Sequence, residues 1–196
     1  MTEKQIERVK TKITKIKKAL AADKRKWGGF YNDGRGLRYL PPELYLKIED
    51  YTGSLRYFNW FKKNFDDDTA SSIFMFEWAL TLFKTKRFAM AENKVKEVFA
   101  LNLFLLDHFL EKKMIPFEEK EGLNWGNIET LKYLNYTRDK ENLIEFAEWL
   151  ELYMKSESFV EFANEIIEIQ DSLINIPGGK RRSELFERRR QLLQEL

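Results

Sequence analysis

The sequence predicts an all-α fold, and three observations lead to that class. Apolar residues recur along the chain with the three- and four-residue spacing of helices, and no segment alternates as a strand does. The 196 residues include only 9 Gly and 4 Pro, while 43% are hydrophobic and 34% are charged, a composition typical of a folded, helix-rich protein. Two segments, 45–58 and 82–95, match in pattern at a separation of 37 residues, which favours stacked helical hairpins.

The N-terminal helix is predicted over residues 2–26. Thr2 and Gln5 have the spacing of a capping box, in which each side chain binds the other residue's backbone N–H. A narrow apolar stripe follows along one side, and its members are Ile6, Val9, Ile13, Ile16 and Leu20. Five large aliphatic side chains on one seam must be covered, either by the same chain or by a second copy. We therefore expect a monomer or a homodimer joined through this helix, and the acidic middle of the chain favours the monomer.

Two helical hairpins are predicted next. Helices are expected at about 37–48, 51–65, 72–85 and 88–101. A turn-rich loop with four glycines precedes them at 27–36, and a loop rich in helix-capping side chains, 66–72, separates the hairpins. Pro41 and Pro42 suit the start of the first helix, where a missing N–H costs little. The side chains expected to be buried in the hairpins are Ser54, Phe58, Phe61, Trp78, Phe88, Ala91 and Val95.

The rest of the chain reads as an irregular insertion followed by further helices. Pro116, Gly122 and Gly126 interrupt the helical pattern at about 112–128. Later helices are expected at about 128–135, 139–155, 157–175 and 183–195. The predicted organisation is thus a basic amphipathic N-terminal helix at 1–28, a helical-repeat domain at 29–177 and a short basic C-terminal helix at 178–196.

The residue types in the two matching segments resemble those of the tetratricopeptide family over about residues 38–102. That family places small residues where two helices approach closely and an aromatic residue at the turn. The matching residues are Ala79, Phe88, Ala91, Val95 and Val98 in the second segment, and Tyr45, Tyr51, Ser54, Phe58 and Phe61 in the first. The resemblance implies tetratricopeptide-like stacked hairpins that bind a partner. The segment from Gly34 to Pro41 also resembles uncharacterised bacterial proteins.

No pattern in the sequence points to catalysis, so we expect a protein without enzymatic activity, cofactor or metal. Cys is absent and His108 is the single histidine, which rules out a Cys-based zinc site and a site with two histidine ligands. The acidic residues 66–68 lack the glycine and distal glutamate of a calcium loop, so helix capping is the better interpretation. Gly34 and Gly36 lack the third glycine and the preceding strand of a dinucleotide-binding motif.

The expected function is a protein–protein interaction scaffold that binds a peptide or a partner helix. In a helical-repeat array the first helix of each hairpin lines the inner surface. The candidate binding residues on those helices are Tyr45, Lys84, Arg38, Lys47, Glu77 and Thr81, with Tyr45 and Lys84 preferred. Residues 1–28 carry a net charge of +7 and residues 178–196 of +3, around a middle of −8. Binding of nucleic acid by these basic helices is the alternative.

The location predicted for the chain is the cytoplasm. The N-terminus lacks the apolar segment and cleavage site of a secretory signal. No run of apolar residues is long enough for a transmembrane helix.

Overall fold

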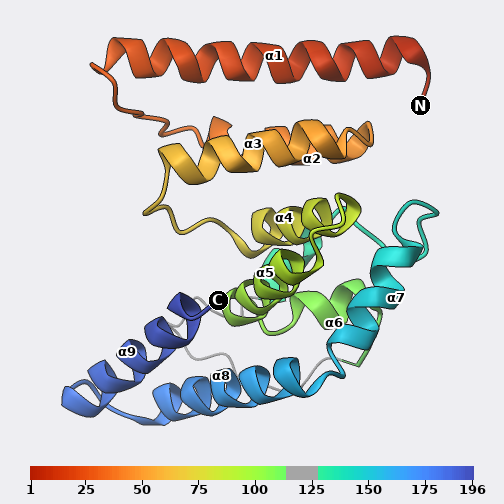
Figure 1. Cartoon of the computed structure of the whole chain (residues 1–196). Helices are drawn as coiled ribbons and strands as arrows, with labels where there is room; N and C mark the ends of the chain where they lie inside the picture. Colours follow the sequence, from red (N-terminus) through yellow and green to blue (C-terminus); the bar gives the residue numbers. More distant parts are fainter. Residues whose placement is uncertain (114–127) are drawn as a thin grey trace. The chain divides into compact units, whose positions relative to one another are not determined.

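The computed structural model describes residues 1–113 and 128–196, and within them the chain forms helices and no strands, which confirms the all-α class. The α-helices are α1 (Glu3–Lys26), α2 (Pro41–Lys47), α3 (Tyr51–Asn64), α4 (Ser72–Lys84), α5 (Phe88–Leu101), α6 (Leu105–Phe109), α7 (Ile144–Tyr153), α8 (Glu157–Asn175) and α9 (Lys180–Gln194). The 3₁₀ helices are η1 (Leu37–Tyr39) and η2 (Ile128–Tyr133). Figure 1 labels the α-helices.

The chain divides into two compact units. Unit 1 comprises Met1–Ala70 and Glu77–Phe88, and unit 2 comprises Ser71–Phe76 and Ala89–Leu196. Helix α4 therefore contributes residues to both units. Unit 1 contains α1 together with α2 and α3, and unit 2 contains α9 together with α8. Most of the insertion predicted at 112–128 lies outside the described residues.

Helix α1 packs on its own chain through the predicted stripe. The predicted capping box is present: the N–H of Gln5 donates to Oγ1 of Thr2, and the N–H of Thr2 donates to Oε1 of Gln5 at 2.9 Å. Ile13, Ile16 and Leu20 are buried in one cluster with Leu44 of α2. Burial of these aliphatic side chains fixes which face of α1 points away from the protein. Figure 1 shows α1 lying along α2 and α3.

The side chains around the start of α3 leave room only for a glycine at position 53. A Cβ at Gly53 would fall 2.6 Å from Cγ of Asp50 and 2.7 Å from Cε1 of Tyr45 on α2, so a larger residue would displace these side chains. One residue further on, Ser54 is fully buried, as predicted, and its hydroxyl lies 2.8 Å from Oγ1 of Thr81 on α4. Phe58 stacks on Trp78 with ring centroids 4.8 Å apart. These contacts join α3 to the part of α4 that belongs to unit 1.

The turns after α2 and α4 have the same local structure. Glu49 and Lys86 adopt left-handed backbone conformations, with φ of 58° and 60°. Each turn has the two hydrogen bonds of a Schellman motif: Glu49 N to Leu46 O, Asp50 N to Tyr45 O, Lys86 N to Phe83 O, and Arg87 N to Leu82 O. Glu49 and Lys86 are 37 residues apart, so the motif falls at matching positions of the two segments. Helix α6 also ends in this way, at Glu111.

Unit 2 has an aromatic core and helix ends that arginines stabilise. The ring of Phe76 lies 4.9 Å from that of Phe109. Helix α9 folds back beside α8 (Figure 1). From α9, Arg182 donates to two carbonyls at the end of α8, and Arg189 donates to the carbonyl of Ala100 at 2.6 Å near the end of α5. These guanidinium groups occupy carbonyls that have no partner within their own helices.

Several details differ from the sequence prediction. Phe88 is 46% exposed, so its predicted burial is wrong. It is the first residue of α5, and its ring meets that of Phe83 in an edge arrangement with centroids 5.6 Å apart. Helix α7 begins at Ile144 because residues 137–143 form successive turns. Within the 66–72 loop, Ser71 has the predicted capping role, because its Oγ accepts from the N–H of Phe74. Asp68 instead accepts hydrogen bonds from Arg38 and Tyr39.

Candidate functional site

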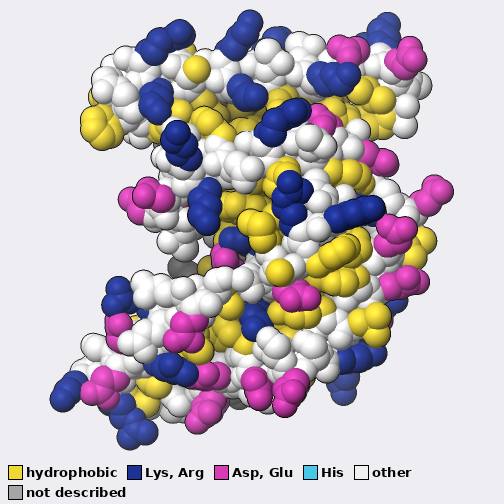
Figure 2. Space-filling view, viewed as in Figure 1, with side chains coloured by type: hydrophobic (Ala, Val, Ile, Leu, Met, Phe, Trp, Pro, Cys, Tyr) yellow, Lys and Arg dark blue, Asp and Glu magenta, His cyan; other side chains and the backbone are white. Residues whose placement is uncertain are grey.

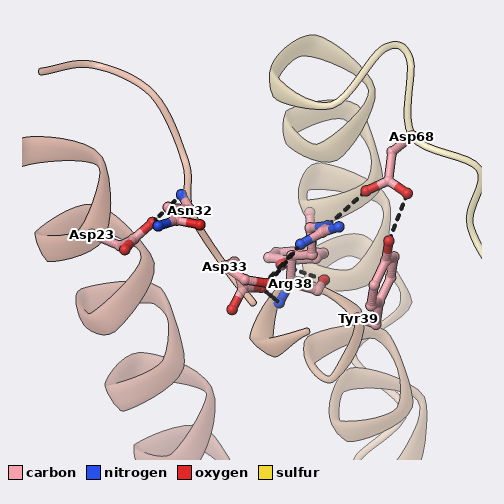
Figure 3. A network of polar contacts seen from close by, with 7 residues as sticks. Asp23, Asn32, Asp33, Arg38, Tyr39 and Asp68 are labelled. Carbon is pink, nitrogen blue, oxygen red and sulfur yellow. Dashed lines mark hydrogen bonds and ion pairs between the residues drawn. The ribbon is translucent and has the colours of Figure 1, made fainter. Parts of the chain in front are cut away.

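Arg38, one of the predicted binding residues, is the centre of a polar network inside unit 1 (Figure 3). Its Nε donates to Oδ2 of Asp68 at 2.6 Å, and its Nη1 donates to the backbone carbonyl of Asp33 at 3.0 Å. The hydroxyl of Tyr39 donates to the other oxygen of Asp68 at 2.6 Å. The Asp33 carboxylate accepts from the N–H of Arg38 at 2.8 Å. The network thus ties the loop at 27–36 to the loop that follows α3.

The electrostatics of this network indicate a structural role. The side chain of Arg38 is only 20% exposed. Burial disfavours its charge, but the hydrogen bond and the charge of Asp68 outweigh that effect and raise the pKa of Arg38. Tyr57 donates to the carbonyl of Arg38 at 2.8 Å, and burial raises the pKa of its hydroxyl. Because the guanidinium is already bound on two sides, Arg38 offers little to a partner molecule.

Three other predicted residues also lie inside the fold. Tyr45 is half-buried and packs against the cluster that holds α1 on α2. Glu77 is only 4% exposed, and Thr81 is fully buried, where it contacts Ser54. The inner surface expected from the first helices of the hairpins therefore does not include Glu77 or Thr81. Lys47 is exposed near the end of α2.

Lys84 lies in a groove that the two matching turns form together. The groove belongs entirely to unit 1 and has a volume of about 420 Å³. Its lining residues are Glu49, Asp50, Tyr51, Thr52 and Leu55 from the first turn and α3, and Lys84, Thr85, Lys86 and Arg87 from the second turn. The ammonium of Lys84 lies 5.9 Å from the ring centroid of Tyr51 and the same distance from that of Phe83.

The groove combines a small apolar area with charges of both signs. Tyr51 and Leu55 are the apolar members, and three cations come from the second turn. The carboxylate of Asp50 is engaged at the start of α3, where it accepts from the N–H of Gly53 at 2.8 Å. The three cations of the lining outnumber its two carboxylates, those of Glu49 and Asp50. Such a surface suits an anionic group beside an apolar one.

The lining residues that sequence reasoning missed are those of the turns themselves. Tyr51 was recognised only as a match between the two segments, while Lys86 and Glu49 occupy the left-handed position of a Schellman motif, where glycine is the usual residue. The available signal was that both turns keep a charged side chain at the position where glycine fits best. The two turns come together through tertiary packing, which the pattern of residue types in the sequence does not reveal.

The lining of the groove holds charged, polar and apolar side chains. It includes no histidine. Among residues 1–113 and 128–196, no three His, Asp or Glu side chains gather as metal ligands would. Within the same residues, no helix has both the length and the apolar character needed to cross a membrane. Comparisons of the chain with protein-family models, with curated proteins and with solved structures found no match.

Proposed function

We propose that this chain is a non-enzymatic adaptor that binds a peptide in the groove between its two matching turns. The observation that carries the proposal is the placement of Lys84 over Tyr51, which joins a cation from the second turn to an aromatic ring from the first. An aromatic ring and a long cation together supply contact area and charge pairing, and such residues are frequent at protein interfaces.

The two hairpins are, in this proposal, copies of one tetratricopeptide-like unit. Their turns share the left-handed residue and the same hydrogen bonds at a separation of 37 residues. The small residues at matching positions, Ser54 and Ala91, are both fully buried. Stacked hairpins of this kind present neighbouring turns along one edge, which gives the groove its lining from two turns.

The charges of the groove select the kind of peptide. Lys84, Lys86 and Arg87 favour carboxylates, while Tyr51 and Leu55 favour an apolar side chain. The ligand class is therefore an extended peptide with an apolar residue flanked by Asp or Glu. Lys86 and Glu49 adopt the left-handed backbone conformation, which is unfavourable for L-residues other than glycine. Strained positions are concentrated at functional sites, which supports a role for these two side chains in the groove.

Panning of a random phage-displayed peptide library on the intact chain tests this proposal. We expect the enriched peptides to share an apolar residue next to acidic residues. The double variant Tyr51→Ala/Lys84→Glu should bind these peptides about tenfold more weakly or worse, because removal of one interfacial contact group changes affinity by about 1–2 kcal/mol.

The chain offers a matched control for this variant. Lys132 lies 5.2 Å from the ring centroid of Tyr133, which is 63% exposed and is remote in sequence from the turns. Tyr133→Ala/Lys132→Glu therefore removes a similar aromatic–cation pair and changes the charge by the same amount. It should leave peptide affinity unchanged. Equal binding by all three proteins, or equal loss in both variants, would show that the turn groove is not the binding site.

A further inference from the structure

The two basic ends of the chain differ in how their cations are used. On α9, Arg182 and Arg189 donate to backbone carbonyls. Three further cations of α9 form ion pairs, which are Lys180–Glu184, Arg188–Glu165 and Arg190–Glu187. Five of the six cations of α9 thus bind groups of their own chain, and three of these five bind carboxylates.

Helix α1 presents a row of cations with no such partners. The row is defined by Lys4, Arg8, Lys12 and Lys15, which together with Glu7 and Thr11 line a shallow groove of about 480 Å³ along the helix. All four cations are exposed. Within the part of the chain that the structure describes, none of them forms an ion pair, and Glu7 pairs with Lys10 instead. Figure 2 shows Lys and Arg side chains spaced along α1.

This row works against the stability of the helix that carries it. Like charges four residues apart on a helix repel each other, and Lys4, Arg8 and Lys12 are spaced in that way. A helix face that is merely solvated usually alternates acidic and basic residues. The buried cluster of Ile13, Ile16 and Leu20 holds the row in place and turns it outward. An anionic partner would remove the repulsion.

We propose that this row binds the phosphate backbone of a nucleic-acid duplex without reading its sequence. The four cations extend over about 17 Å, because a helix rises about 1.5 Å per residue. One strand of a duplex places a phosphate about every 3.4 Å along its axis, so the row spans about five nucleotides.

A membrane surface fits the row less well. A helix that lies on a bilayer inserts an apolar face between the lipid headgroups. Three residues of the apolar stripe of α1, Ile13, Ile16 and Leu20, are already buried with Leu44, and Val9 is partly buried against them. The outward face offers cations, Thr11 and Glu7, which favour contacts with phosphates in water.

Fluorescence anisotropy with a labelled DNA duplex tests this proposal on the intact chain. If four phosphates are neutralised, affinity should fall on the order of a hundredfold between about 50 and 200 mM salt. The variant Lys4→Gln/Arg8→Gln/Lys12→Gln/Lys15→Gln should lose at least about tenfold in affinity at the lower salt concentration, and its salt dependence should be much weaker. Glutamine and lysine have similar helix propensity, so α1 should stay helical by circular dichroism.

A control variant removes the same charges elsewhere in unit 1. Lys47→Gln/Arg56→Gln/Lys62→Gln/Lys63→Gln also changes three lysines and one arginine, all exposed, and should bind the duplex as the unchanged protein does. Lys4→Arg/Lys12→Arg/Lys15→Arg keeps the charges and should also retain binding. Equal loss in the two glutamine variants, loss in the arginine variant, or no binding by the unchanged protein at about 50 mM salt would overturn the proposal. So would binding to phosphatidylserine vesicles without binding to the duplex.

Discussion

At position 86, a lysine holds a backbone conformation that glycine adopts without steric cost. The Cβ of an L-residue in the left-handed region disfavours that conformation by about 1–2 kcal/mol, and glycine is the usual residue at this position of a Schellman motif. Lys86 nevertheless lines the groove together with Lys84, and Glu49 does the same from the other turn. At the scale of single residues, the proposed function therefore requires charged side chains at positions 49 and 86, where glycine would give the more stable protein.

Replacement of this lysine by glycine should stabilise the protein. We expect Lys86→Gly to raise the free energy of unfolding by about 1 kcal/mol, because the relief of steric strain exceeds the added flexibility of the unfolded chain, which costs about 0.4–1 kcal/mol. Lys17→Gly, at an exposed position within α1, should have the opposite effect and lower it by about 1 kcal/mol. Chemical denaturation measures both. A loss of stability in Lys86→Gly as large as that in Lys17→Gly would mean that the turn does not have this conformation.

At the scale of the helices, burial of small residues distinguishes the two sides of α5. Ala91 is fully buried, whereas Ala89 on the same helix is exposed. Ala91→Leu should cost about 1–3 kcal/mol of stability because a buried site has no room for three extra carbons, and Ala89→Leu should stay within about 0.5 kcal/mol. Thermal and chemical denaturation of the two variants provide the comparison. Equal stability of the two would place residue 91 at the surface and contradict the matching of the hairpins.

Helix boundaries were predictable where the sequence carries explicit start and stop signals. Helix α1 begins with its capping box, and α8 begins after the side chain of Ser156 and ends just before Pro177. Both agree with the predicted ranges within one residue. Helix α7 has no side-chain cap at Leu143, so the apolar pattern alone placed its start too early. The exposure of Phe88 was missed for a related reason: periodicity describes a helix interior, whereas Phe88 is a first residue that follows a turn.

At the scale of the whole chain, the sequence revealed how charge is distributed but not how it is used. The positive charge of both ends was evident from composition. The structure distinguishes the two ends: cations of α9 form ion pairs. Among the described residues, no ion pair involves the α1 cations Lys4, Arg8, Lys12 and Lys15. Likewise, Lys84 was recognised as a candidate, but its neighbour Tyr51 belongs to a different hairpin, and the two come together only through tertiary packing.

The most direct test of the central claim is to map where an acidic peptide binds. Because the groove and α1 are both basic, affinity alone does not separate them. We therefore propose a ¹⁵N NMR titration of the intact chain with a peptide enriched by panning. The account predicts that amide shift changes cluster at residues 49–55 and 84–87, around the groove. Shift changes confined to residues 4–15 or to unit 2, with none at the two turns, would contradict it.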